Sequence, residues 1–214
     1  KLTGTLRAAA HLLGIETVAG PWLPPLTDVV TIAALSREPR ACRLPVALLD
    51  LPEEQRQSNL VIDLAAGEHW LAVGAPGSGK TTLLRTIAGQ LAARLAATEV
   101  HLYVLDSNAG ALAPLARLPH CGAVLARSPR AVDRLLTKLT IEVQRRRQLF
   151  ASRGVSAAAE INAGARGSDC RQARPVPWML LLLDDWASFA DACDRMGGRP
   201  ISTLGRLLRD GPSA

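Results

Sequence analysis

An eight-residue stretch near the middle of the chain constrains its fold more than any other feature. Gly74 to Thr81 reads G-A-P-G-S-G-K-T and matches the phosphate-binding pattern G-x-x-x-x-G-K-[ST] at every defined position. Glycines let such a loop curl until successive backbone N–H groups point inward and donate to phosphate oxygens. The stretch therefore predicts a turn between a strand and a helix that binds phosphate groups.

The residues on either side of this loop have the hydrophobic patterns that it needs. Trp70 to Val73 is a short apolar run, which predicts a buried strand entering the loop. After the loop, apolar residues recur at helical spacing: Leu83, Leu84, Ile87, Ala88, Leu91 and Leu95. This context favours a nucleotide site over a glycine-rich turn without a ligand. The expected nucleotide-binding residues are Gly74, Ala75, Pro76, Gly77, Ser78, Gly79, Lys80, Thr81 and Thr82.

Four side chains predict that the nucleotide is bound with magnesium. Lys80 is expected to place its ammonium on the β- and γ-phosphates, and the Thr81 hydroxyl to take one Mg²⁺ coordination position. Trp178 to Leu183 predicts a buried strand that ends in Asp184 and Asp185, which is the Walker B arrangement. Asp184 is expected to complete the metal site. Asp185 follows where many P-loop ATPases place a carboxylate that orients or deprotonates the attacking water, so Asp185 and Lys80 are the catalytic candidates. Acids here can also cap a following helix.

Strands and helices alternate along the rest of the chain. Val46 to Leu49 and Leu60 to Ile62 predict a small antiparallel element, and Val100 to Leu105 and Ala123 to Leu125 predict further strands. A helix is expected from Ser128 to about Arg153, because a helix-capping residue is followed by proline. Alternation of this kind predicts an α/β fold with a parallel sheet flanked by helices, whose ligands bind at the carboxyl ends of the strands.

The N-terminal part of the chain has a different pattern. Lys1 to Leu13 has apolar residues at helical spacing, and Pro21 to Leu26 is too rich in proline for a helix or a central strand. We expect this proline-rich segment to be extended, with Trp22 and Leu26 packed on the core; the alternative is a proline-rich ligand for a recognition domain. We therefore divide the chain into an N-terminal helix with its connector, residues 1–43, and a P-loop domain, residues 44–214.

Composition and charge limit the kinds of partner. The chain has 214 residues, of which 48% are hydrophobic, so it can bury a sizeable core. The net charge of +6 suits DNA, acidic proteins or an anionic membrane surface, but the basic residues are scattered and only 3% of residues are aromatic. Solvated helix surface is therefore favoured over nucleic-acid binding. No apolar run approaches the roughly 20 residues that span a bilayer.

Two further features have structural rather than catalytic interpretations. The four cysteines lie far apart without metal-ligand spacing, so we expect reduced thiols and neither zinc nor disulfides. Asp106, at the end of an expected strand, can support the metal site indirectly or form a turn. His120 is expected to be structural.

Several of these motifs together resemble the FtsK/SpoIIIE ATPases. The resemblance is carried by Val73 with the P-loop, Asp106 to Leu112, Leu118 to His120, Glu142 with Arg145 and Arg146, and the strand into Asp184 and Asp185. Three other motifs are similar to the tandem ATPase domains of the EccC-type ATPases of actinobacterial type VII secretion: Trp22 to Leu26, Leu49 to Gln57 and Leu118 to Val124. The resemblance covers about residues 20–212.

This resemblance implies a P-loop NTPase fold of the RecA-like (ASCE) type, with ATP and Mg²⁺ as cofactors. It also implies a cytoplasmic motor anchored to the membrane, with sister ATPase domains, a membrane-embedded secretion complex and small helical secreted effectors as partners. The resemblance implies a P-loop ATPase that binds ATP. Family members that hydrolyse ATP usually have Asp-Glu where this chain has Asp184-Asp185, so both full hydrolysis and weak or lost hydrolysis stay open. The family's central sensor strand follows the Walker B helix, so the domain is expected to be incomplete at its C-terminal end.

Three functions remain open at this point. The first is an ATPase domain that couples nucleotide state to effector recognition or export. The second is a nucleotide-stabilised recognition module that docks effector helices without turnover, which the Asp-Asp pair favours. The third is a DNA translocase, suggested by the FtsK-like core and the positive charge but disfavoured because no basic, aromatic-bearing appendage is visible.

Overall fold

The computed structural model describes residues 2–15, 22–107, 110–126, 128–164, 175–195 and 197–212. The chain divides into two compact units. Unit 1 comprises Lys1–Ser36 and Ala47–Leu60, and unit 2 comprises Arg37–Val46 and Val61–Ala214. The division into residues 1–43 and 44–214 stays a prediction.

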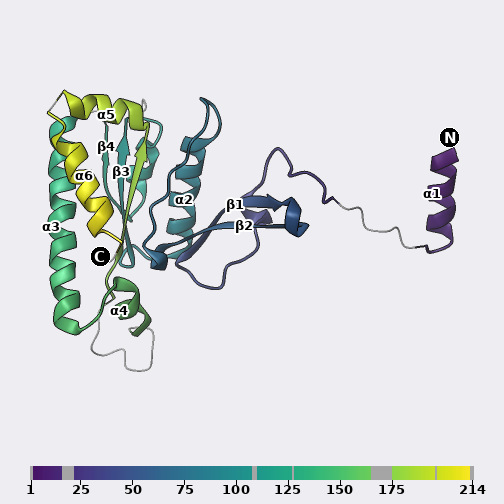
Figure 1. The fold of residues 1–214 in the computed structure, drawn as a ribbon, viewed down its shortest axis with the longest axis horizontal. Coiled ribbons are helices and arrows are strands. Elements are labelled where there is room, and N and C mark those ends of the chain that lie inside the picture. Colours follow the sequence, from purple (N-terminus) through teal and green to yellow (C-terminus); the bar gives the residue numbers. More distant parts are fainter. Residues whose placement is uncertain are drawn as a thin grey trace. The chain divides into compact units, whose positions relative to one another are not determined.

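Three parallel strands form the sheet of unit 2: β3 (Val100–Asp106), β4 (Cys121–Leu125) and β5 (Trp178–Asp184). Their order is β4-β3-β5, so β3 is central (Figure 1). The parallel sheet confirms the predicted fold class. The register places Asp106 opposite Asp184, so both acids lie at the carboxyl edge where ligands were expected.

Helices lie on both sides of this sheet (Figure 1). Helix α2 (Lys80–Arg94) lies on one side, and α3 (Pro129–Arg153) and α6 (Arg199–Asp210) lie on the other. Helix α5 (Trp186–Asp194) follows β5 directly. The remaining elements of unit 2 are α4 (Ala158–Gly164), η3 (Leu64–Ala66) and η4 (Ala113–Arg117).

The alternation of side chains along the strands builds a core on each face of the sheet. On one face, Leu105 packs with buried residues of α3, α5 and α6, namely Val132, Leu135, Leu136, Leu139, Val143, Phe189, Cys193, Leu204 and Leu207. Leu102 and Val104 are fully buried and, by alternation, point to the opposite face. Helix α2 lies there and buries Ile87, Ala88 and Leu91.

The strand predicted at Trp70 to Val73 is wrong. These residues form no strand, and Leu71 and Val73 are 85% and 87% exposed. A strand needs a neighbour for its backbone hydrogen bonds. In the described part of the chain, the strands of the sheet pair only in the order β4-β3-β5. An apolar run of four residues cannot show by itself whether such a neighbour exists.

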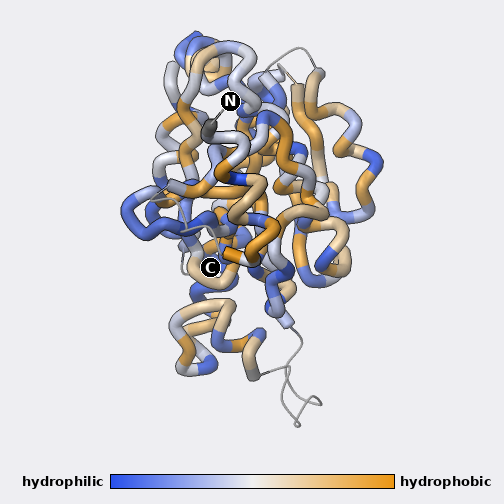
Figure 2. Tube along the Cα trace, turned by 90° about the vertical axis from the view of Figure 1, so that its right-hand side faces the viewer, coloured by the Kyte–Doolittle hydropathy of each residue, from blue (hydrophilic) through white to orange (hydrophobic). Residues whose placement is uncertain are grey.

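Hydrophobic segments along the chain are interrupted repeatedly by hydrophilic ones (Figure 2). Within the described ranges, no helix combines the length and the apolar character needed to cross a bilayer. The thiols of Cys42, Cys121 and Cys193 are free, and Cys170 lies outside the described residues.

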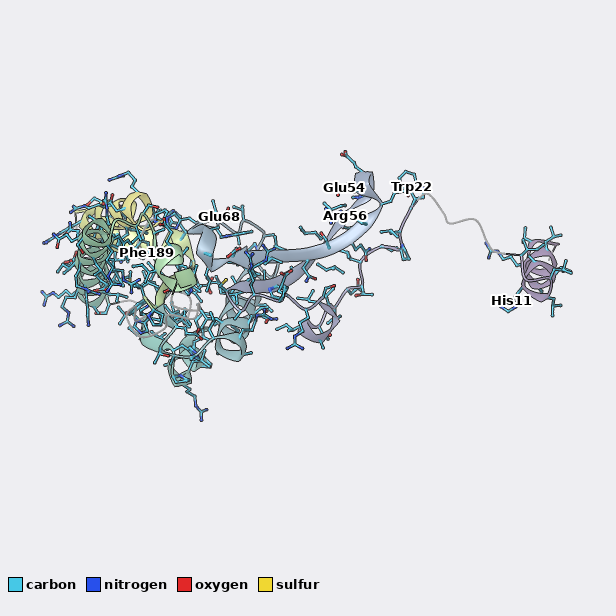
Figure 3. The ribbon with its side chains drawn as sticks, turned by 90° about the horizontal axis from the view of Figure 1, so that it is seen from below. His11, Trp22, Glu54, Arg56, Glu68 and Phe189 are labelled. Atoms are coloured by element: carbon cyan, nitrogen blue, oxygen red, sulfur yellow. The ribbon has the colours of Figure 1, made fainter. Side chains whose placement is uncertain are left out.

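Unit 1 contains α1 (Leu2–Leu12), η1 (Ile32–Ala34), η2 (Pro52–Glu54) and the larger parts of β1 (Arg43–Leu51) and β2 (Arg56–Asp63). The strands pair as a hairpin around η2, as expected. Glu54 and Arg56, labelled in Figure 3, form an exposed ion pair at its turn. Gln57 Nε2 donates to Pro24 O at 2.9 Å and ties the proline-rich segment to β2. Trp22 is 78% exposed, and its packing on the core stays a prediction.

A buried arginine fixes the entry to β5. The Arg146 side chain is 2% exposed. Its Nε donates to Glu142 Oε1 at 2.8 Å, and its Nη1 donates to Pro177 O at 2.7 Å. Because Pro177 immediately precedes β5, Arg146 ties α3 to the start of the strand that carries Asp184. The Glu142 and Arg146 of the family motif are therefore structural.

Glu142 predicts how stability depends on pH. Hydrogen bonds from Arg145 and then from Arg146 lower its pKa from an ordinary value of 4.5 to about 2. Because the folded pKa is depressed, the carboxylate stabilises the fold in full above about pH 4.5, and this contribution is lost as the pH falls toward 2. Glu142→Gln should lower the free energy of unfolding at pH 7 by about 1 kcal/mol, since solvent screens this partly exposed pair.

Urea unfolding at pH 7, 4.5 and 3 checks this expectation. The difference in the free energy of unfolding between wild type and Glu142→Gln should decrease as the pH falls. Glu53 is exposed and serves as the control, because Glu53→Gln should change the free energy of unfolding little at any pH. A difference in unfolding free energy that stays constant across this pH range would contradict the lowered pKa of Glu142.

Candidate functional site

Two glycines of the P-loop have a backbone conformation that favours glycine. Gly77 and Gly79 have φ angles of 77° and 91°, in the left-handed region that favours glycine. At Gly74 a Cβ atom would lie 2.5 Å from Ser78 Oγ and 3.2 Å from Ser78 Cβ, so the Ser78 side chain would have to shift to admit it. The loop therefore curls as the glycine pattern predicts, and residues 74–79 are exposed.

Lys80 is the first residue of α2 and folds back over the loop. Its Nζ donates to Gly74 O at 2.7 Å and to Ala75 O at 2.8 Å. The ammonium is thus held against the loop from which phosphate contacts are expected. Thr82, two residues further along α2, is exposed.

Thr81 and Asp184 lie 103 residues apart in sequence and meet in the structure. Thr81 Oγ1 donates to Asp184 Oδ2 at 2.7 Å. Asp184 is 5% exposed at the end of β5, and its other carboxylate oxygen accepts from Asp185 N at 3.1 Å. A hydroxyl and a carboxylate are oxygen donors of the kind that Mg²⁺ takes together with substrate phosphates. The residues therefore fit the predicted ion, and the structure brings them together as the sequence led us to expect.

Asp185 has both an unusual backbone and a specific partner. Its φ and ψ of 59° and 75° lie in the left-handed region. Its carboxylate accepts from Ser188 N at 3.2 Å and from Ser188 Oγ at 2.5 Å. Asp185 is thus the N-cap of α5, which is the capping role considered above. Its action on a water molecule stays a prediction.

The structure gives Asp106 and His120 structural partners. Asp106 Oδ2 accepts from Leu112 N at 2.7 Å and closes the turn after β3. His120 is buried, and its Nε2 lies 2.8 Å from Leu95 O at the C-terminal cap of α2. Asn108 and Ala109 of the family motif lie outside the described residues.

Arg85 is a neighbour of the site that sequence reasoning missed. Its Nε donates to Ala111 O at 3.0 Å, and its Nη2 contacts the same oxygen. Arg85 lies four residues after Thr81, which puts both side chains on one face of α2. This four-residue spacing is the sequence feature that could have identified Arg85. The same helix face therefore contacts both the end of β5 and the loop after β3.

A mainly apolar cavity of about 340 Å³ lies beside this edge of the sheet. It is lined by the ends of β3 and β4 and by α5, including Ser107, Ser188 and Cys193. Burial raises the pKa of the Cys193 thiol, which keeps it protonated. Residues 74–82 do not line the cavity. In the described residues, the candidate nucleotide site is therefore a surface cradle rather than this cavity.

A family model and several known proteins are similar to this chain. The model of the FtsK/SpoIIIE family matches residues 32–191. The ESX-4 secretion system protein EccC4 of Mycobacterium tuberculosis is 38% identical over 173 residues. These residues make up 78% of this chain and 14% of that protein, so the chain spans only a small part of the relative's length.

Two solved structures from Thermomonospora curvata share the fold. The cytoplasmic domain of the type VII secretion ATPase EccC matches with a TM-score of 0.72 and 26% identity, over 90% of this chain and 24% of that one. EccC ATPases 2 and 3 in complex with a signal sequence peptide match with a TM-score of 0.66 and 28% identity, over 89% of this chain and 34% of that one.

Proposed function

Because this chain belongs to the FtsK/SpoIIIE family, we propose that it is an ATP-binding domain of a type VII secretion motor. The phosphates bind to residues 74–82, and Mg²⁺ is held by Thr81 and Asp184. The contact between these two side chains at 2.7 Å carries the proposal, because it joins the P-loop helix to the end of β5. Bound Mg²⁺ would supply charge neutralisation on the phosphates, and the Lys80 ammonium, held against Gly74 O and Ala75 O, would add a second positive charge at the loop.

We infer the partners of the domain from its relatives. EccC4 is a secretion system protein, and one EccC structure holds a signal sequence peptide. We propose that this domain works in the cytoplasm beside sister ATPase domains, as part of a complex anchored to the membrane. Its nucleotide state would be coupled to recognition or export of small helical effectors.

The engagement of Asp185 with Ser188 favours a second candidate function. A carboxylate that accepts two hydrogen bonds from one residue is occupied as a helix cap. The domain would then bind Mg-ATP as a stabilising ligand and recognise effectors without turnover. Robust ATP hydrolysis by the wild-type chain would exclude this candidate, and strong stimulation by DNA with a steep salt dependence would instead support a translocase.

Two glycines of different conformation test the proposed phosphate site. Gly79→Ala places a side chain at a φ of 91° and should weaken ATP binding by about tenfold or more, because it distorts the loop that donates to the phosphates. Gly89 lies within α2 with open space around its Cβ position, so Gly89→Ala should leave ATP affinity unchanged. Calorimetric titration with Mg-ATP measures the ATP affinities of wild type and of the two variants. Equal affinities for both variants and wild type would refute the site.

A further inference from the structure

A continuous series of hydrogen bonds runs from the P-loop helix to α5. Thr81 Oγ1 donates to Asp184 Oδ2, and Asp185 N donates to Asp184 Oδ1. The Asp185 carboxylate in turn accepts from the backbone and the hydroxyl of Ser188. Each oxygen of the buried Asp184 carboxylate therefore accepts a hydrogen bond, one from the P-loop helix and one from the residue that begins the cap of α5. Together they set the orientation of the carboxylate that the proposed metal site needs.

The conformation of Asp185 suits this arrangement. A left-handed backbone is rare outside glycine, and Asp and Asn are among the few residues that adopt it readily. Among the described residues, Asp185 and Gln55 are the two non-glycine residues with a positive φ. An uncommon backbone at the end of the Walker B strand indicates that the surrounding contacts hold it in place.

The partner of Asp185 is itself fixed to the core. Phe189, the residue after Ser188 and labelled in Figure 3, is 2% exposed and belongs to the main core cluster. Its ring lies 5.6 Å from that of Trp186, centroid to centroid. Helix α5 therefore gives Ser188 a firm position from which to hold the Asp185 side chain.

We infer that Asp185 is a positioning residue for the magnesium site and that Ser188 supports it. Asp185 acts through its main-chain N–H on Asp184, while its carboxylate caps α5 instead of acting on the attacking water. The inference rests on the proposed function, because it takes Thr81 and Asp184 to hold Mg²⁺. It deepens that function by replacing the catalytic role predicted for Asp185 with an orienting one.

Asparagine and alanine at position 185 separate the two roles. Asparagine has nearly the same shape, adopts the left-handed backbone and can still accept a bond from Ser188, but it cannot take a proton from water. Alanine loses the cap as well as the charge. Ser188→Ala removes the hydroxyl donor and leaves the backbone donor in place.

The experiment compares wild type, Asp185→Asn, Asp185→Ala and Ser188→Ala. Binding of a fluorescent ATP analogue, titrated with Mg²⁺, gives the Mg²⁺ concentration at half-maximal tight binding. Asp185→Asn should stay within about threefold of wild type in this value and in ATP turnover. Asp185→Ala should raise the value by about tenfold or more, as expected when a group that orients a metal ligand is lost. Ser188→Ala should shift it in the same direction by less, and the thermal midpoint of each nucleotide-free variant reports its folding.

Three results would overturn the inference. The first is a loss of turnover of about a hundredfold in Asp185→Asn at an unchanged Mg²⁺ requirement, which is the size expected for a general base. The second is an unchanged Mg²⁺ requirement in both folded Asp185→Ala and Ser188→Ala. If Asp185→Ala does not fold, an unchanged Mg²⁺ requirement in Ser188→Ala is enough to overturn the inference. The third is wild type that binds no ATP, which refutes the proposed function itself and is recognised before any variant is compared.

Discussion

Replacing Lys80 with alanine is expected to weaken ATP binding by about a hundredfold or more. A lysine ammonium is a compact point charge, and charge-assisted hydrogen bonds to phosphate are stronger than neutral ones. Each hydrogen bond to a charged group contributes about 1.5–3 kcal/mol, and each 1.4 kcal/mol is about tenfold in affinity. Loss of contacts to both the β- and γ-phosphates therefore removes most of the binding. Calorimetric titration with Mg-ATP measures the change.

The controls for this substitution follow from the contacts of Lys80. Its ammonium donates to Gly74 O and Ala75 O, so the alanine variant also loses two contacts within the loop. The thermal midpoint of the nucleotide-free variant therefore has to be compared with wild type. Lys138 is exposed on α3, and Lys138→Ala should bind ATP like wild type. Retention of wild-type affinity by folded Lys80→Ala would exclude the P-loop as the phosphate site.

Elements with a local signature were predictable from the sequence. Helix α3 begins at Pro129 after Ser128 and ends at Arg153, as expected, because the start and stop signals are themselves local. Gly154 caps its end with a φ of 66°. Strand β5 was also predicted, because a continuous apolar run with acids at its end is typical of a buried parallel strand.

The meeting of Thr81 with Asp184 was predictable for a different reason. Parallel strands bring their carboxyl ends to one edge, and the P-loop helix starts at that edge. The P-loop and the Walker B strand are local motifs, and the topology of a parallel sheet brings them to one edge. The contact between Thr81 and Asp184, 103 residues apart, could therefore be predicted. Asp106 lies at the same edge, but the sequence did not distinguish support of the metal site from formation of a turn. The hydrogen bond from Leu112 N to Asp106 Oδ2 is visible only in the folded chain.

Features that depend on distant partners were not predictable. The apolar character of Trp70 to Val73 is visible in the sequence, whereas a neighbouring strand for it is not. The left-handed backbone of Asp185 depends on the position of Ser188 and on the packing of α5. The contact from Arg85 to Ala111 depends on where the loop after β3 returns to α2.

Replacing Asp184 with asparagine is expected to remove the dependence of ATP binding on Mg²⁺ and to lower any turnover by about a hundredfold or more. Changes to groups that only orient a metal ligand already cost about 10–100-fold, so loss of a ligand's charge should cost at least as much. Asparagine is the informative choice because Asp184 is 5% exposed and alanine would leave a cavity. The Thr81 hydroxyl can donate to or accept from the new amide, so the local contact survives.

Asp106 provides the matched control for this substitution. It is the register partner of Asp184 on the neighbouring strand and is 2% exposed, so both variants change a buried acid at one edge of the sheet. Asp106→Asn should lower the thermal midpoint, because it weakens the turn at Leu112, while ATP affinity should still rise when Mg²⁺ replaces EDTA. For Asp184→Asn the affinities in Mg²⁺ and EDTA should coincide. If Asp184→Asn instead kept the Mg²⁺ effect and Asp106→Asn lost it, the metal ligand would be Asp106, and the 2.7 Å contact with Thr81 would be only structural.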